Sequence, residues 1–259
     1  MKQRYAIVGA GGRHEMYRDA ILGPYAAEAT LTGLCDNNRG RLALSAGIVR
    51  EKTGLDLPVY ESDAFDAMIT ETRPDWVIVT TKDSLHDAYI CRAMELGCHV
   101  ITEKPMTIDA DRCRRILKTQ RRTGRQLRVT FNYRYSPLRT QVKDLLMNGV
   151  IGDVLSVDFH WMLDIRHGAD YFRRWHRNKE NSGGLLAHKA THHFDLVNWW
   201  LDSTPKMVYA TGRRAFYRPE TALRYGLTGR SERCHDCPEA KRCRFHLSLA
   251  ENPHLRALY

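Results

Sequence analysis

Short apolar runs alternate with helix-like patterns over the first half of the chain, and this alternation constrains the fold most strongly. The runs are rich in β-branched and aromatic residues, and the stretches between them are long enough for the crossover helices that parallel strands need. The pattern predicts an α/β fold with a doubly wound parallel sheet. We expect strands at Tyr5–Val8, Thr30–Cys35, Val59–Tyr60, Trp76–Thr80, His99–Ile101 and Gln126–Phe131.

The segments between these runs carry helix patterns with recognisable boundary signals. Asp63 is expected to cap the helix that contains Phe65, and Gly124 is expected to end the last helix. The other helices are expected at Glu15–Glu28, Arg39–Thr53, Leu85–Leu96 and Asp109–Thr123.

The second half of the chain has a different pattern. Residues 154–162 and 207–216 resemble strands, and they flank a helix expected over residues 185–201. This arrangement predicts an α+β domain over residues 132–259, after an α/β domain over residues 1–131.

Composition narrows the class of protein. The 259 residues are 43% hydrophobic, and no apolar run approaches the ~20 residues of a membrane span, so we expect no membrane contact. The apolar stretch after Met1 is too short for a secretory signal, which favours a cytoplasmic location. The formal net charge is +10, but the arginines are dispersed. The basic cluster in residues 112–122 has helical spacing, so we interpret it as a solvated helix face and expect no nucleic-acid partner.

The segment Gly9-Ala10-Gly11-Gly12-Arg13-His14 lies where the first strand must turn into the first helix. Glycines permit a tight turn there and let backbone N–H groups at the helix N-terminus approach a pyrophosphate. The segment therefore indicates a dinucleotide-binding Rossmann domain, and a plain structural turn is the alternative. His14 stands where Gly or Ala is usual, so the packing or the phosphate approach must differ at that position.

Asp36 ends the second strand, about 20 residues beyond the glycine segment, where a carboxylate can bind ribose hydroxyls. A carboxylate there would repel a 2′-phosphate, which favours NAD. Arg39 or Arg41 could offset that repulsion, so NADP stays an alternative. A second role for Asp36, as a helix N-cap, is compatible with the first.

Glu103-Lys104-Pro105 ends a strand at the sheet edge where dinucleotide-binding sheets hold their ligands. With residues 74–80 and His86 upstream, this segment resembles the Gfo/Idh/MocA family of NAD(P)-dependent oxidoreductases. The resemblance runs from Tyr5 to about Trp200. Its later parts are residues 132–137, residues 149–154 and Gly183-Gly184, followed by His188, His192 and Asp195.

The resemblance implies hydride transfer between NAD(P) and a hydroxyl carbon of a sugar, polyol or sugar acid. It implies that Lys104 is the catalytic lysine and His192 the general acid or base. The chemistry agrees, because an imidazole titrates near neutral pH and can take the hydroxyl proton while an ammonium polarises the developing alkoxide. Further cofactor contacts are expected from Asn37, Thr80, Thr81, His86, Glu103 and Lys104.

Two other functions stay open. One is a glycoside-cleaving enzyme that oxidises its substrate transiently with bound NAD, as some relatives in that family do. The other is a non-catalytic, dinucleotide-binding regulatory protein.

His188 stands where the family typically carries an Asp, four residues before His192. On one helix the two rings would share a face and could bind substrate, relay a proton or hold a metal that has a third ligand. We interpret His193 as a packing residue. The aromatic and cationic segment 166–177 is predicted to bind substrate, with oligomer contacts or nucleic-acid-like stacking as the alternative. The expected substrate contacts are Lys104, Arg134, Tyr135, Arg174, His176, His188 and His192.

Cys234, Cys237 and Cys243 have a metal-like spacing. A structural zinc, completed by His235 or His246, is one interpretation, and free thiols are the other. The family resemblance also implies an open antiparallel sheet in the second domain, used for substrate binding and for packing in a homo-oligomer, a dimer or tetramer. The chain is short for such a sheet, so we expect it to be incomplete.

Overall fold

The computed structural model describes residues 1–229, 231–251, 253 and 256. These residues divide into two compact units. The first unit contains residues 1–130 together with residues 180–183, and the second contains residues 131–179 and the described residues from 184 onward.

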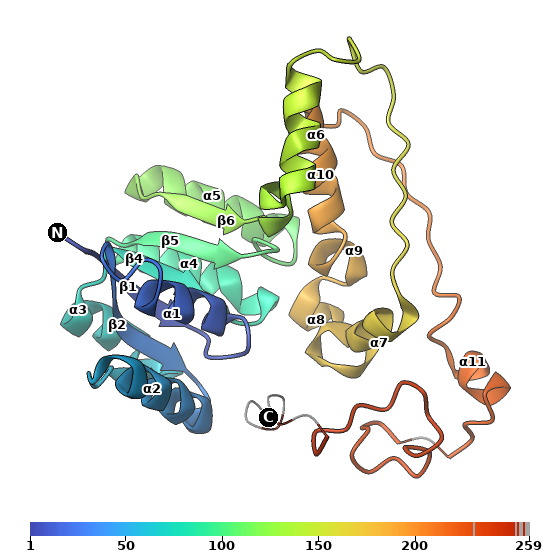
Figure 1. Cartoon of the computed structure of the whole chain (residues 1–259), viewed down its shortest axis with the longest axis horizontal. Helices are drawn as coiled ribbons and strands as arrows, with labels where there is room; N and C mark the ends of the chain where they lie inside the picture. Colours follow the sequence, from blue (N-terminus) through green and yellow to red (C-terminus); the bar gives the residue numbers. More distant parts are fainter. Residues whose placement is uncertain (230, 252, 254–255, 257–259) are drawn as a thin grey trace. The chain divides into compact units, whose positions relative to one another are not determined.

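The first unit is built on a six-stranded sheet with the strand order β3-β2-β1-β4-β5-β6 (Figure 1). Every pair of neighbouring strands is parallel, as predicted. The chain reverses its direction of winding between β1 and β4, and in such sheets the ligand crevice lies outside the carboxyl ends at this point. The strands are β1 (Gln3–Val8), β2 (Ala29–Asp36), β3 (Val59–Glu61), β4 (Trp76–Val79), β5 (His99–Glu103) and β6 (Leu127–Thr130).

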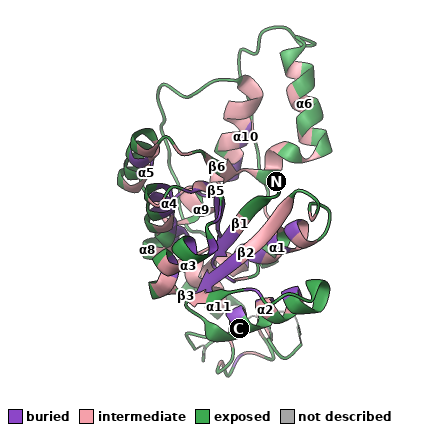
Figure 2. Cartoon of the chain, turned by 90° about the vertical axis from the view of Figure 1, so that its left-hand side faces the viewer, coloured by how far each residue is buried: buried purple, intermediate pink, exposed green. Residues whose placement is uncertain are grey.

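Helices cover both faces of the sheet and bury alternate residues of each strand. Ala6 and Val8 of β1 pack in one hydrophobic cluster with α3, α4 and α5, whereas Ile7 packs in a second cluster with α1 and α2. The buried residues accordingly follow the central strands in Figure 2. The helices are α1 (His14–Leu22), α2 (Arg39–Thr53), α3 (Phe65–Thr72), α4 (His86–Glu95) and α5 (Ala110–Thr123), with short 3-10 turns η1 (Ser62–Ala64) and η2 (Asp83–Leu85).

Most predicted helix ends are confirmed, and two are wrong. α1 ends at Leu22 rather than Glu28, because Gly23-Pro24 follows and proline cannot continue the backbone hydrogen bonds. Asp63 lies inside η1 and does not cap α3, whose N-cap position is Ala64. At α5, Asp109 accepts the N–H of Arg112 at 2.9 Å, and Gly124 ends the helix in the left-handed conformation.

The second unit is helical where it is regular, and no strand is assigned among its described residues. The predicted strands over residues 154–162 and 207–216 are therefore wrong, and so is the antiparallel sheet expected within the described part of the chain. Among the described residues neither stretch is paired with another strand, and Leu155 and Met207 are almost fully exposed. A strand needs a second strand to pair its backbone, which an apolar pattern alone does not supply.

The remaining helices follow β6 in the chain, and no described helix is both long and apolar enough to cross a membrane. They are η3 (Asn132–Tyr135), α6 (Pro137–Met147), α7 (Ile165–Arg173), η4 (Trp175–Arg177), α8 (Lys179–Ser182), α9 (Leu185–His188), α10 (Thr191–Leu201) and α11 (Pro219–Arg224).

Candidate active site

The glycine segment forms a close turn between β1 and α1. Gly9 has a φ of +99°, and a Cβ on it would lie 2.7 Å from the backbone of Thr80, so only glycine fits. A Cβ on Gly11 would meet no atom within 4 Å, which means that the turn is open on that side. No side chain caps the N-terminus of α1. Its first N–H groups can therefore receive an anion such as a pyrophosphate.

Asp36 joins the end of β2 to this turn. Its carboxylate accepts the N–H of Ala10 at 2.5 Å and the N–H of Asn38 at 2.7 Å. The N-cap of α2 is Asn38, which accepts the N–H of Arg41 at 3.0 Å, so the capping role considered for Asp36 is wrong. Asn37 lies exposed beside the carboxylate.

His14 lies almost fully buried beneath the turn rather than on its open side. Its Nδ1 is 2.5 Å from the carbonyl oxygen of Gly11, and its Nε2 is 2.8 Å from the Ser45 hydroxyl of α2. Burial lowers the pKa of His14, so the neutral ring donates at Nδ1 and accepts at Nε2. The imidazole fills the space at the usual Gly or Ala position and ties the turn to α2.

Glu103, at the end of β5, is buried and binds two side chains of the α1 region. Its Oε1 lies 2.9 Å from Nε of Arg13 and accepts the Tyr17 hydroxyl at 2.8 Å. The Tyr17 oxygen is also 3.0 Å from Oγ1 of Thr130. Arg13 and Glu103, both expected at the cofactor, thus bind each other and fix the start of α1 against β5.

His86 links the ends of β4 and β5. The fully buried ring has its Nδ1 2.9 Å from the carbonyl oxygen of Pro105 and its Nε2 3.2 Å from that of Thr81. Both carbonyl oxygens can only accept, so the ring is placed to donate to the strand ends. The neighbouring Thr80 hydroxyl donates to the carbonyl oxygen of Gly9 at 2.6 Å. These hydrogen bonds connect the segments that follow β1, β4 and β5, and Lys104 lies in the last of them.

Asp83 is a residue of this edge that sequence reasoning missed. It lies in η2, directly before His86, with 3% of its surface exposed. Burial raises the pKa of Asp83 to about 7, although the nearby cations of His86 and Lys104 lower it. A carboxyl, an imidazole and the expected catalytic ammonium therefore share the carboxyl edge of the sheet. The sequence signal was an acidic residue within the segment that joins a buried strand to His86.

In the second unit, His192 lies at the start of α10 and is 4% exposed. Its ring stacks on Tyr133 of η3, with the centroids 4.0 Å apart and the planes 10° from parallel. Phe131 contacts it edge-on at 6.2 Å. The Tyr133 hydroxyl accepts a hydrogen bond from Nζ of Lys189 at 2.9 Å. Aromatic packing thus holds the imidazole in one orientation.

Arg134 and Tyr135, two predicted substrate contacts, have different surroundings. The Arg134 guanidinium forms a two-pronged ion pair with Asp195, in which Nε donates at 2.8 Å. Tyr135 is 80% exposed. The ion pair joins η3 to α10 and so supports the stack of Tyr133 on His192.

A second aromatic group brings together predicted substrate residues. The rings of His176 and His188 lie 4.7 Å apart, and Trp175 and Tyr171 lie 5.4 and 5.6 Å from His188. Burial lowers the pKa of His176 to about 3, and His188 and Arg174 act in the same direction. His176 is therefore neutral at physiological pH.

Comparison with protein families identifies both units of the chain. Residues 3–131 match the model for an oxidoreductase family with an NAD-binding Rossmann fold, and residues 143–238 match the C-terminal alpha/beta domain of that family. The chain belongs to the Gfo/Idh/MocA family. The glycine turn and Asp36 both lie within the part that matches the NAD-binding Rossmann fold.

Individual members of the family are similar over most of this chain. The Bacillus subtilis (strain 168) protein YteT, whose name describes it as an oxidoreductase, is 37% identical over 231 residues, which are 89% of this chain and 54% of YteT. Inositol 2-dehydrogenase of Rubrobacter xylanophilus is 27% identical over 80% of this chain and 54% of the enzyme. The crystal structure of the WlbA dehydrogenase of Chromobacterium violaceum with NADH and UDP-GlcNAcA is 25% identical, with a TM-score of 0.64 over 77% of this chain and 55% of WlbA. The chain thus spans about half the length of these relatives.

The helix expected over residues 185–201 is interrupted in this family member. α9 ends at His188 and α10 begins at Thr191, with Lys189 and Ala190 between them. His188 and His192 therefore lie on different helices and do not share a helix face, so that prediction is wrong. Among the described residues, no group of three His, Cys, Asp or Glu side chains could hold a metal ion, which removes the metal role considered for this pair.

The same finding contradicts the zinc site predicted at Cys234, Cys237 and Cys243, because these described residues form no such group. A carboxylate connects this loop to the chain instead. Oε1 of Glu239 accepts the N–H groups of Thr228 and Gly229, both at 3.0 Å. The three thiols are free, which is the other interpretation of their spacing, and the hydrogen bonds to Glu239 cross-link the loop.

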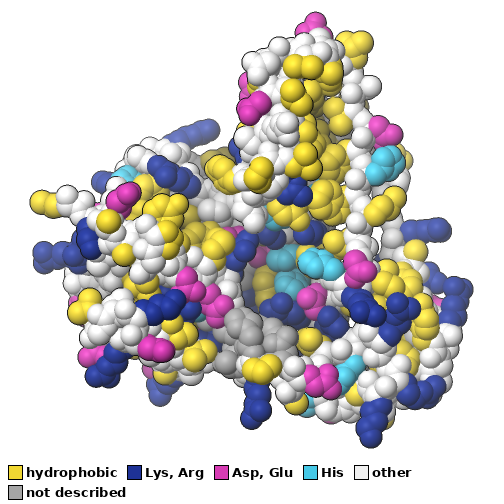
Figure 3. Space-filling view, viewed as in Figure 1, with side chains coloured by type: hydrophobic (Ala, Val, Ile, Leu, Met, Phe, Trp, Pro, Cys, Tyr) yellow, Lys and Arg dark blue, Asp and Glu magenta, His cyan; other side chains and the backbone are white. Residues whose placement is uncertain are grey.

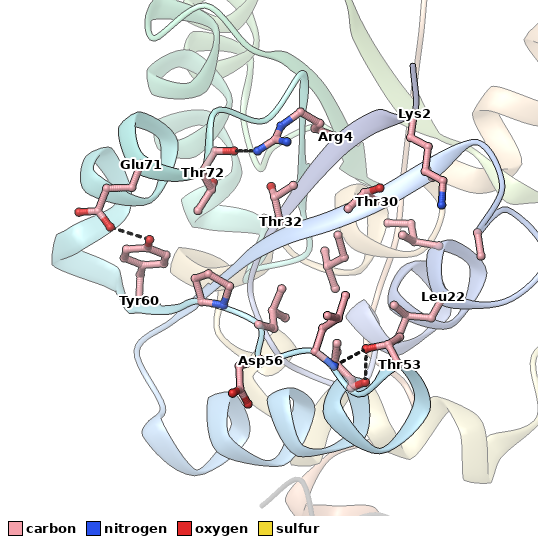
Figure 4. A pocket seen from close by; sticks show the side chains of 18 residues that line it. Lys2, Arg4, Leu22, Thr30, Thr32, Thr53, Asp56, Tyr60, Glu71 and Thr72 are labelled. Carbon is pink, nitrogen blue, oxygen red and sulfur yellow. Dashed lines mark hydrogen bonds between the residues drawn. The ribbon is translucent and has the colours of Figure 1, made fainter.

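A cavity of about 620 Å³ lies at the opposite, amino edge of the sheet (Figure 4). Arg4 and Thr30, near the amino ends of β1 and β2, line it together with Thr53. Nε of Arg4 donates to the carbonyl oxygen of Arg73 at 3.0 Å, and the Thr53 hydroxyl donates to that of Val49 at 2.8 Å. Because dinucleotide-binding sheets hold their ligands at the carboxyl ends, this cavity is not the candidate active site.

Proposed function

We propose that the protein is an NAD-dependent oxidoreductase that transfers a hydride between a hydroxyl carbon of a sugar, polyol or sugar acid and the nicotinamide. The observation that carries this proposal is the position of Lys104. It follows β5 at the same sheet edge as the glycine turn, with the buried groups of Asp83 and His86 beside it.

The residues present fit a bound dinucleotide. Gly9, Gly11 and Gly12 let the backbone at the start of α1 approach the pyrophosphate, and Asp36 is positioned for the ribose hydroxyls. The Asp36 carboxylate would repel a 2′-phosphate, which favours NAD over NADP. When bound, NAD would supply the hydride acceptor.

The chain supplies the proton chemistry. In this proposal His192 takes the proton of the substrate hydroxyl, since a histidine ring can act as a base near neutral pH. The Lys104 ammonium stabilises the negative charge that develops on the same oxygen. Tyr133 and Phe131 keep the His192 ring in place, so the ring loses little rotational freedom when substrate binds.

The names of the relatives support the substrate class. One is an inositol dehydrogenase, and another was crystallised with a sugar nucleotide and NADH. Assembly into a dimer or tetramer stays a prediction, and light scattering on the purified protein measures it.

The test incubates purified protein and NAD with a panel of sugars, inositols and sugar acids. Absorbance of the reduced cofactor and cleavage of glycosidic bonds are followed together. Reduction of NAD without cleavage supports the proposal, and cleavage without net reduction indicates the glycoside-cleaving alternative. NAD binding without either reaction across the panel would contradict both and favour a regulatory protein.

A further inference from the structure

We propose that Lys189 and Arg139 form an anion-binding site beside His192, and that the substrate is a sugar acid whose carboxylate binds there. This inference rests on the proposed function, because it narrows the substrate class of the same site. All the residues that carry it belong to the second unit.

Both cations lie close to the ring of Tyr133. The Arg139 guanidinium, from α6, lies 4.1 Å from the centre of the Tyr133 ring and 5.5 Å from that of Trp161. Nζ of Lys189, from the interruption between α9 and α10, is 5.3 Å from the centre of the same Tyr133 ring and donates to its hydroxyl. Tyr133 in turn stacks on His192. An anion held by either cation would therefore lie close to the proposed base.

Among the residues that the structure describes, no acidic side chain forms an ion pair with these two cations. Neighbouring arginines have carboxylate partners: Arg134 pairs with Asp195, and Arg173 pairs with Asp170. Among the ion pairs of the described residues, neither Lys189 nor Arg139 has such a partner. A cation against an aromatic face keeps its hydrogen-bond donors, so both groups can still bind a carboxylate.

His193 lies within reach of the same two cations. It lies next to His192 in α10, with its ring 4.4 Å from Trp161. Burial lowers the pKa of His193, and both Lys189 and Arg139 lower it further. Both cations therefore act on the start of α10. Figure 3 shows histidine side chains gathered in the region of α9, with Lys and Arg and also Asp and Glu side chains around them.

The surroundings suit a sugar acid better than a neutral polyol. A carboxylate accepts several hydrogen bonds and makes charge-assisted ones with Lys and Arg, which are stronger than neutral ones. Trp161 is partly exposed and offers an aromatic face against which a sugar ring can pack. A neutral sugar would cover the two cations without neutralising them, and this cost makes the site selective.

The test compares acidic and neutral sugars of the same configuration. Isothermal titration calorimetry measures binding of D-galacturonate against D-galactose and D-glucuronate against D-glucose, with and without NAD. We expect at least one uronate to bind about tenfold or more tightly than its neutral counterpart, the ratio that one charge-assisted contact provides. This preference should fall as salt is added, because salt screens the charges.

Charge-removing variants locate the site. Lys189→Met and Arg139→Gln should each remove most of the preference for the uronate, because the uronate loses affinity and the neutral sugar does not. Lys206→Met and Arg214→Gln remove the same charges from exposed positions of the second unit and should leave the preference intact. If one variant fails to fold, the salt dependence of the unaltered protein and the other variant still decide.

Equal affinities within both pairs, no binding of either uronate, or a preference that survives both variants would overturn the inference. Failure of the proposed function has a different signature. In that case the protein would bind a uronate through Lys189 and Arg139 but would neither bind NAD nor reduce it.

Discussion

The rings of Tyr133 and His192 lie face to face, 4.0 Å apart, and Lys189 holds the tyrosine hydroxyl. The stack restricts the imidazole of the proposed base. We predict that Tyr133→Leu lowers kcat by about tenfold or more, because the ring loses its fixed orientation. Tyr133→Phe keeps the stack and should retain most of kcat. Steady-state kinetics with the best substrate of the panel measures both variants, and equal losses would mean that the hydroxyl, not the stack, matters.

Removing either proposed catalytic group should abolish turnover without loss of the cofactor. Lys104→Met removes the ammonium at the oxygen, and His192→Ala removes the base, so each should lower kcat by about 100-fold or more. NAD affinity, measured by quenching of tryptophan fluorescence, should stay within about twofold to threefold, since the glycine turn is untouched. If a variant turned over at the original rate, the residue that it replaces would not have the proposed catalytic role.

The glycine turn offers a matched pair of variants. Gly9→Ala places a Cβ 2.7 Å from the Thr80 backbone at a φ of +99°, so it should cost about 1–3 kcal/mol of folding stability. Gly11→Ala meets no protein atom, so its stability should change by less than about 1 kcal/mol. Its NAD affinity should nevertheless fall, because the methyl group stands on the open side of the turn. Urea unfolding and fluorescence titration measure the two effects, and unchanged NAD affinity in Gly11→Ala would place the pyrophosphate elsewhere.

Asp83 should make folding stability depend on pH. Its pKa is raised from 3.8 to about 7, so the folded protein binds more protons than the unfolded chain between these values. Burial of this carboxyl therefore leaves the free energy of unfolding unchanged below pH 3.8. As the pH rises from there to about 7, it lowers the free energy of unfolding by on the order of 1.4 kcal/mol per pKa unit. As the pH rises from 5 to 8, the folding stability of Asp83→Asn should therefore increase relative to that of the unaltered protein.

The matched control for this experiment is Asp153→Asn, which alters an exposed carboxyl. Urea unfolding at pH 5 and at pH 8 should show the same change in folding stability for this variant as for the unaltered protein. If Asp83→Asn also behaved in this way, Asp83 would be ionised throughout the range.

The sheet was predictable because its strands are buried on both faces and therefore appear as continuous apolar runs, such as Trp76–Val79. The glycine turn was predictable because a tight turn and a close backbone approach both require glycine. The interruption at Lys189 and Ala190 was not, since neither residue is a proline or glycine that marks a helix end. Asp83 was missed because its chemistry depends on burial and on cations brought by other segments, which a local pattern does not contain.

The central claim is that Lys104 and His192 act on one substrate hydroxyl. A crystal structure of the protein with NAD and a substrate from the panel measures this directly. We predict that Nζ of Lys104 and a ring nitrogen of His192 both lie at about 3 Å from the same hydroxyl oxygen. A complex in which the oxygen contacts only one of them, with the other on a separate surface, would contradict the account.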